Sequence, residues 1–206
     1  RRRGVPGGLG PPAGAGAACT EKQTIQPGAS NTYALTVFST SPNGSIVSDC
    51  AKGAKFIGSA KVTINTTNQN LVGIGNQLLP GVNGEAYNSF AVEDATNKVV
   101  LPLIMDHNSG LFTGFSVQLV GGSPSTVNCT FTGTSYTVSK ALNVGDALVD
   151  NQNGKIFPTL PAGSVRYVGG ATCTADKADA KIVAVVNEAG TGTGDQLLVY
   201  EGAASQ

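Results

Sequence analysis

The only histidine in the chain, His107, lies in the segment MDHNSG directly after Asp106. An aspartate and a histidine, together with one of the many serines, could form a hydrolase site in which the imidazole is the general base. However, the sequence contains no G-x-S-x-G motif, and an aspartate adjacent in the chain is poorly placed to orient the ring. We therefore interpret His107 as a turn residue, and we expect no catalytic residues and no enzymatic activity.

Two polar segments have the composition of ligand-binding loops. DALVDNQNGK, residues 146–155, contains two Asp and two Asn, but their spacing differs from the D-x-[DN]-x-[DN]-G calcium loop. We interpret this segment as a polar hairpin. GTGTGDQ, residues 190–196, is rich in glycine, but it lies between two predicted strands and offers no helix N-terminus to a phosphate. The sequence therefore predicts neither a metal site nor a cofactor site.

The four cysteines, Cys19, Cys50, Cys129 and Cys173, are widely spaced and form no C-x-x-C pair, and a single histidine cannot complete a zinc site with them. An even number of scattered cysteines in a chain rich in Gly, Thr and Asn favours disulfides over buried free thiols. We predict the local pairs Cys19–Cys50 and Cys129–Cys173, each worth about 3–4 kcal/mol in the chain-entropy model. Disulfides indicate an extracellular or cell-surface location.

The charge balance argues against two classes of partner. Thirteen basic and 13 acidic side chains give a formal net charge of zero, whereas binders of nucleic acid or of anionic membranes need a basic surface. No apolar run approaches the roughly 20 residues of a membrane helix, so we expect no membrane insertion. Glycosylation sequons begin at Asn43, Asn65 and Asn128, and they would accept glycans in a secreted chain, although a bridged Cys129 makes the last one a poor site.

The segments that would position these residues have the composition of short β-strands, rich in Val, Ile, Thr, Phe and Tyr. They read NTYALTVFS, AKVTINTT, LVGIGNQ, KVVLPLIM, GFSVQLVGG, STVNCTFTG, KIFPTL, SVRYVGGATCTA and KIVAVVNE. Turn sequences such as SPNGS, PGVNGE, HNSG, GGSPS and DNQNGK separate them. No amphipathic helix of ten residues or more is evident. The pattern predicts an all-β fold, either a sandwich or a barrel, and of these we expect Ig-like β-sandwiches.

The chain contains an internal repeat. FIGSAKVTINTTNQNLVGIGNQ, from Phe56, aligns with YVGGATCTADKADAKIVAVVNE, from Tyr167, at an offset of 111 residues, the difference between positions 56 and 167. Two residues of slippage later, Tyr87 aligns with Tyr200. The repeat predicts two tandem domains, residues 19–98 and 99–206, after an extended Gly/Pro-rich tail, residues 1–18. The first copy lacks a counterpart of the stretch that precedes Cys129, so it should be a sandwich without its N-terminal strands.

Several motifs resemble the tandem β-sandwich repeats of large secreted bacterial surface proteins. They are LPLIMDHNSGLFTGFSVQLVGGSPSTVNCTF, IQPGASNTY and SAKVTIN…NLVGIGNQ…GEAYNSF. The resemblance covers nearly all of the chain from residue 24 onward. It departs from the family pattern where VGIGNQ replaces a V-N-E strand ending, where SVQLVGG lacks an Asn, and in the Arg/Gly/Pro head. The resemblance implies a β-sandwich fold and a structural role, and its motifs say little about ligands.

These observations predict a structural subunit of an extracellular filament or surface layer, with copies of itself as partners. A sandwich without strands exposes core and unpaired backbone, so a neighbouring subunit should complete it by β-strand exchange. The donor would be the small-residue stretch Ala13, Gly14, Ala15, Gly16, Ala17 and Ala18, with Pro6, Pro11 and Pro12 outside the ladder. Two alternatives stay open for the tail, namely folding back on its own domain and belonging to a fragment whose preceding repeat supplies the strands.

A secreted adhesin or carbohydrate-binding module is the alternative function. It would need a cluster of exposed aromatic residues or a metal loop. The chain has no Trp and only 6% aromatic residues, and no such cluster is evident.

Overall fold

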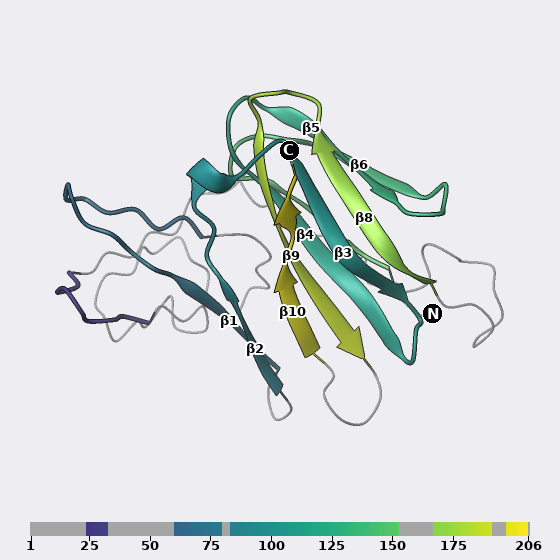
Figure 1. Ribbon diagram of the computed structural model, residues 1–206, viewed down its shortest axis with the longest axis horizontal. Helices are drawn as coiled ribbons and strands as arrows, with labels where there is room; N and C mark the ends of the chain where they lie inside the picture. The colour runs from purple at the N-terminus through teal and green to yellow at the C-terminus, as the bar shows by residue number, and fades with distance from the viewer. Residues whose placement is uncertain (1–23, 33–59, 80–82, 153–166, 191–196, 206) are drawn as a thin grey trace, which may run out of the picture. The chain divides into compact units, whose positions relative to one another are not determined.

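The computed structural model describes residues 24–32, 60–79, 83–152, 167–190 and 197–205 (Figure 1). The chain divides into two compact units, residues 1–58 and 59–206. In the first unit only residues 24–32 are described. They contain a turn in which the Ala29 N–H donates to the Gln26 carbonyl at 2.9 Å, with Gly28 at a positive φ of 77°. This turn lies in IQPGASNTY, one of the motifs that carry the resemblance to the surface-protein repeats.

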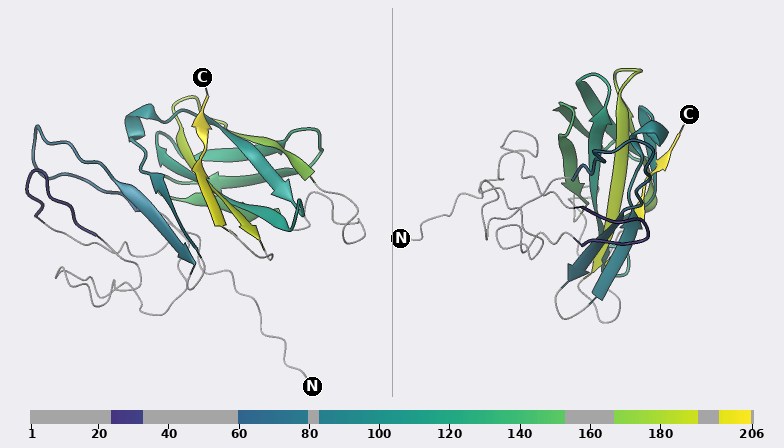
Figure 2. Two further views of the ribbon diagram at one scale, coloured as in Figure 1. Left: turned by 60° about the horizontal axis from the view of Figure 1, so that its bottom comes forward. Right: turned by 90° about the vertical axis from the view of Figure 1, so that its left-hand side faces the viewer.

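Residues 98–205 form two antiparallel sheets that lie face to face, which confirms the prediction of an all-β fold (Figures 1 and 2). One sheet has the order β10-β9-β4-β7, with β10 Leu197–Glu201, β9 Lys181–Gly190, β4 Leu111–Gly121 and β7 Ala147–Asn151. The other has the order β11-β3-β8-β5-β6, with β11 Ala203–Ala204, β3 Lys98–Asp106, β8 Tyr167–Ala175, β5 Ser125–Phe131 and β6 Thr137–Leu142. Apart from one 3-10 turn, Val92–Asp94, the described residues contain no helix.

The core lies between the sheets because alternate residues of each strand point inward. Phe115, Val117 and Leu119 of β4 are buried, whereas the residues between them are partly exposed. On the facing sheet, Val127 and Phe131 of β5 are buried in the same alternating pattern. The rings of Phe115 and Phe131 meet at the centre, with centroids 6.0 Å apart and tilted by 55°. These contacts fix the facing positions of β4 and β5.

The predicted disulfide between Cys129 and Cys173 is confirmed. Cys129 in β5 lies directly opposite Cys173 in β8, and both residues are fully buried. The bridge therefore joins neighbouring strands of one sheet, whereas the bridge of antibody domains joins the two sheets. Cys19 and Cys50 lie outside the described residues, and so does the tail that contains the predicted donor residues 13–18.

Gly202 carries the chain from one sheet to the other. It follows β10 and precedes β11, and its N–H donates to the Ala184 carbonyl at 2.9 Å. A Cβ built at Gly202 would lie 2.7 Å from Val99 Cγ2 and 2.9 Å from Ala184 Cβ, both on buried residues. Only glycine fits at this crossing without displacement of the core.

We expect Gly202→Val to lower the free energy of unfolding by about 2 kcal/mol, the usual cost of overpacking a core. Urea denaturation followed by tyrosine fluorescence measures this change. Ala203→Val is the matched control because Ala203 is adjacent and exposed, and we expect it to change stability by no more than about 0.5 kcal/mol. Equal losses in the two variants would contradict the packing explanation.

A separate two-stranded sheet precedes the sandwich. It is a hairpin of β1 Ile74–Leu79 and β2 Asn83–Asn88, and Asn83-Gly84 is the turn signal predicted for it. The sequence also predicted a strand in AKVTINTT. That prediction is wrong for residues 60–67, which form no strand and are exposed. The alternating pattern is present, but the described part of the chain provides no strand to pair with it.

Candidate functional site: an exposed hairpin and a buried polar row

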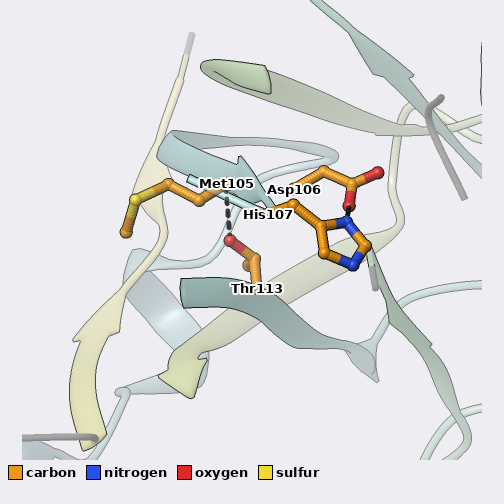
Figure 3. A network of polar contacts seen from close by, with 4 residues as sticks. All are labelled: Met105, Asp106, His107 and Thr113. Carbon is orange, nitrogen blue, oxygen red and sulfur yellow. Dashed lines mark hydrogen bonds and ion pairs between the residues drawn. The ribbon is translucent and has the colours of Figure 1, made fainter. Parts of the chain in front are cut away.

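His107 lies in the turn between β3 and β4, as the sequence predicted, with a positive φ of 56°. The expectation that the adjacent aspartate could not orient the ring is wrong. His107 Nδ1 lies 2.6 Å from Asp106 Oδ1, so the neighbouring carboxylate does contact the ring (Figure 3). The imidazole side chain is 55% exposed, and among the described residues no serine hydroxyl hydrogen-bonds it.

In the segment 146–155, which the sequence predicted as a polar hairpin, residues 147–151 form the strand β7. Residues 153–155 lie outside the described residues, so the hairpin itself stays a prediction. Its carboxylates make contacts within the fold. Asp146 Oδ2 accepts the Asn143 N–H at 2.9 Å, and Asp150 Oδ2 accepts the Tyr136 hydroxyl at 3.0 Å. Burial, followed by the Asp150 contact, raises the pKa of Tyr136 to about 12. Within the described ranges, no group of three His, Cys, Asp or Glu residues could hold a metal ion.

Three polar side chains form a row across the inner face of the four-stranded sheet, and we call Glu188, Thr113 and Gln152 the buried polar row. All three are 0% exposed. Thr113 of β4 pairs with Glu188 of β9, and on its other side the Gln152 N–H donates to the Thr113 carbonyl at 2.8 Å. The three residues thus lie next to one another, on β9, on β4 and directly after β7, where a sandwich core is normally apolar.

The Thr113 hydroxyl is the centre of this row. It donates to the Glu188 carboxylate, with Oγ1 2.7 Å from each of Oε1 and Oε2. It also accepts the Met105 N–H from the opposite sheet at 2.6 Å (Figure 3). Burial raises the pKa of Glu188 to about 7, and the Thr113 hydrogen bond partly opposes that shift. Burial and the nearby Glu188 carboxylate also raise the pKa of Tyr200.

Gln152 completes the row, and the oxygen of its side-chain amide has no hydrogen-bond partner. Its Nε2 donates to Asp150 Oδ2 at 3.1 Å, but its Oε1 is buried without a hydrogen-bond partner. A buried polar atom of this kind is costly, since about nine in ten such atoms are paired in native proteins. No motif in the sequence indicates any member of the row.

No protein-family model matches this chain, and neither does any curated protein or solved structure. The function must therefore be inferred from the site itself.

The segment that leads into the hairpin, together with its first residue, exposes a group of large aliphatic side chains. They are Val62, Ile64, Leu71, Val72 and Ile74, with Val72 91% and Ile74 65% exposed. Exposed apolar residues that form one patch on a protein surface are typical of a site where another element packs. Asn65 and Asn128, two of the predicted glycosylation positions, are also exposed. None of the helical residues in the described part forms a helix long and apolar enough to cross a membrane.

The hairpin has the same strand register as β9 and β10. Gly75 pairs with Tyr87 in the hairpin, and Val186 pairs with Tyr200 in the sandwich. These are the positions that the sequence repeat aligned. The neighbouring strand pairs agree with the repeat as well. Ile74 pairs with Asn88 in the hairpin, and the aligned residues Val185 and Glu201 pair in the sandwich.

Proposed function

We propose that this chain is a structural subunit of an extracellular filament or surface layer, which assembles by β-strand exchange between neighbouring copies. On this proposal the chain consists of two tandem Ig-like sandwiches, residues 19–98 and 99–206, after an extended tail, residues 1–18. The proposal rests on one observation above all. The hairpin β1–β2 has the strand register of β9–β10, but in the described part of the chain no strand pairs with β1 as β4 pairs with β9.

The missing strand follows from the pairing of the two hairpins. In the sandwich, β9 lies between β10 and β4, so both of its edges are hydrogen-bonded. In the described part of the chain, β1 pairs with β2 alone. β2 lies beside β10, and the Asn88 N–H donates to Glu201 Oε1 at 2.6 Å. The other edge of the hairpin is that of β1, and an unpaired edge is a template for another strand. We infer that an added strand occupies the position that β4 occupies beside β9.

The exposed side chains indicate what the added strand would cover. Val185 is partly buried in the sandwich, whereas its counterpart Ile74 is mostly exposed. A strand beside β1 would shield Ile74 and the preceding Val72, so association would bury apolar surface as well as pair backbone groups. The proposed donor is residues 13–18 of a neighbouring copy, whose small side chains allow close backbone approach.

Two truncations test this assignment with a matched control. Deletion of residues 1–18 should abolish polymers seen by negative-stain microscopy, because it removes the donor strand. Deletion of residues 1–12 should leave assembly intact, because it keeps Ala13–Ala18. Circular dichroism checks that both truncated chains keep their β structure. A synthetic peptide of residues 1–18 should bind the longer truncation, and normal polymers formed without residues 1–18 would show that exchange by the tail is wrong.

A carbohydrate-binding module gains no support from the described residues. The large apolar residues exposed in that part of the chain are all Ile, Val or Leu. Sugar-binding surfaces instead use exposed aromatic rings as platforms.

A further inference from the structure

The buried polar row has no part in the proposed assembly, yet it brings together a hydroxyl, a carboxylate and a carboxamide in a dry core. These are the groups of a nucleophile, a general base and an acyl donor. Glu188 comes from β9, Thr113 from β4 and Gln152 from the residue directly after β7, so their juxtaposition depends on the strand register. The arrangement is thus a built feature of the fold.

Thr113 is placed as an activated nucleophile. A hydroxyl has one donor hydrogen and two acceptor lone pairs. The hydrogen points to Glu188 at 2.7 Å, and one lone pair accepts the Met105 N–H at 2.6 Å. The second lone pair is left to attack a neighbouring carbon. Glu188 is suited to remove the proton because burial brings its pKa to about 7, the value at which a general base works well near neutral pH.

Gln152 is placed as the acyl donor. It follows β7 directly, and its N–H donates to the Thr113 carbonyl at 2.8 Å, one position beyond the last pair of the β4–β7 ladder, Gly114–Asn151. Facing residues at such a position have Cβ atoms roughly 5 Å apart. Its Nε2 is held by Asp150, whereas its Oε1 has no partner. Because the carboxamide is held through its nitrogen, one face of its carbonyl carbon stays open to attack. Water is excluded, so hydrolysis does not compete with attack by the hydroxyl.

We propose that Thr113 and Gln152 join through an intramolecular ester between Thr113 Oγ1 and Gln152 Cδ. Thr113 Oγ1 attacks Cδ while its proton passes to Glu188, and a tetrahedral intermediate forms. The Cδ–Nε2 bond then breaks, and the nitrogen leaves as ammonia after it takes up the proton that the hydroxyl gave. One C–O bond replaces one C–N bond, and no oxidant or second reactant is needed. The reaction occurs once per chain, and escape of ammonia into solvent makes it effectively irreversible.

The crosslink would fasten β4 to the end of β7. β7 is an edge strand that pairs with β4 alone in the described part of the chain. A covalent bond at this position would keep β7 from separating from β4 when tension is applied to a polymer. The inference does not depend on strand exchange, because it concerns bonds within a single chain.

Intact-mass measurement of the full-length, reduced chain tests the crosslink directly. We expect a mass lower than that of the sequence by one ammonia, about 17 Da. Tandem mass spectrometry of a digest should find the Thr113 peptide joined to the Gln152 peptide. The loss should vanish in Thr113→Val, Gln152→Met and Glu188→Gln, and it should persist in Thr113→Ser, which keeps the hydroxyl. Thr137→Val, on the exposed face of β6, is the control that should keep the loss.

Three outcomes would overturn the proposal. The first is a wild-type chain with the full mass of its sequence. The second is an ammonia loss that persists in Thr113→Val, which would instead indicate a succinimide at an Asn-Gly pair such as Asn83-Gly84. The third is a digest in which the two peptides are found separately. Because the wild-type chain alone can give the first and third results, the test does not depend on whether a variant folds.

Discussion

Replacing both Cys129 and Cys173 with alanine is expected to lower the free energy of unfolding of residues 59–206 by about 4 kcal/mol. The two residues are 44 positions apart, and closing a loop of that length in the unfolded chain accounts for this value in the chain-entropy model. Loss of two buried side chains from the centre of the five-stranded sheet acts in the same direction. Urea denaturation gives the change, and four of the five tyrosines lie in this unit and report on it.

The neighbouring register position provides a matched control. Thr130 and Thr172 pair directly across the same two strands, one residue from the bridge, and neither is buried. Replacing both with alanine should cost less than about 1 kcal/mol, the usual range for cross-strand pairs. If the cysteine pair costs no more than the threonine pair, the bridge does not stabilise the sandwich.

The sequence predicted the central strands because their side chains carry the signal of a half-buried or buried sheet. β5 alternates apolar and polar residues from Ser125 to Phe131, and the structure buries every second one. β9 reads as a continuous apolar run, as a strand covered on both faces does, and the consecutive residues Ile182, Val183 and Ala184 are all buried. The pair Cys129–Cys173 was predicted as a local pairing, and the structure places the two cysteines directly opposite each other on β5 and β8.

The edge strands were missed for a physical reason. β6, TVSKAL, and β7, ALVDN, each pair with one neighbour in the described part of the chain, and both contain polar and exposed residues. An edge strand needs less apolar surface and often carries charge, so its pattern resembles that of a loop. The converse error occurred at VTINTT, where the local pattern indicates a strand but says nothing about whether a partner is present.

The buried polar row could not be predicted from local patterns. Thr113 and Glu188 are 75 residues apart, and each reads alone as an ordinary polar residue in a strand. Gln152 lies in the polar segment DNQNG, where an inward-facing side chain is not expected. Their proximity is a consequence of register across three strands, which the sequence specifies only through the complete packing of the core.

The Ig-like assignment, the tandem duplication and the tail stay predictions. The shared register of the two hairpins is what the duplication predicts, since slippage by one residue would have exchanged the faces of every side chain. The donor residues of the tail are tested by the truncations.

Glu188→Gln, made in a Thr113→Val background, is expected to raise the free energy of unfolding by about 3 kcal/mol at about pH 8 and to change it little at about pH 4. The background variant cannot form the proposed ester, so the measurement isolates the buried carboxyl. Burial raises the pKa of Glu188 from 4.5 to about 7. Thr113→Val removes the hydrogen bond that opposes this rise, so the pKa stays raised.

The direction of the pH effect follows from the sign of that shift. A carboxyl whose pKa is higher in the folded chain binds its proton more tightly there than in the unfolded chain. Its contribution to stability is therefore complete below about pH 4.5 and is lost as the pH rises to about 7, because the buried charge lacks a compensating partner. Glutamine carries no charge at any pH. Residue 188 of the double variant should therefore cause no loss of stability between about pH 4.5 and pH 7.

Urea denaturation of the Thr113→Val chain with and without Glu188→Gln, at about pH 4, 6 and 8, measures the difference between the two pH profiles. Glu93→Gln in the same background is the control, since Glu93 is exposed, and its profile should run parallel to that of the background chain. The two profiles for position 188 should meet near pH 4 and separate steadily above it. If the two profiles for position 188 run parallel, Glu188 is not held in a dry core. Its proposed role as the base that activates Thr113 would then be wrong as well, because that role requires the raised pKa.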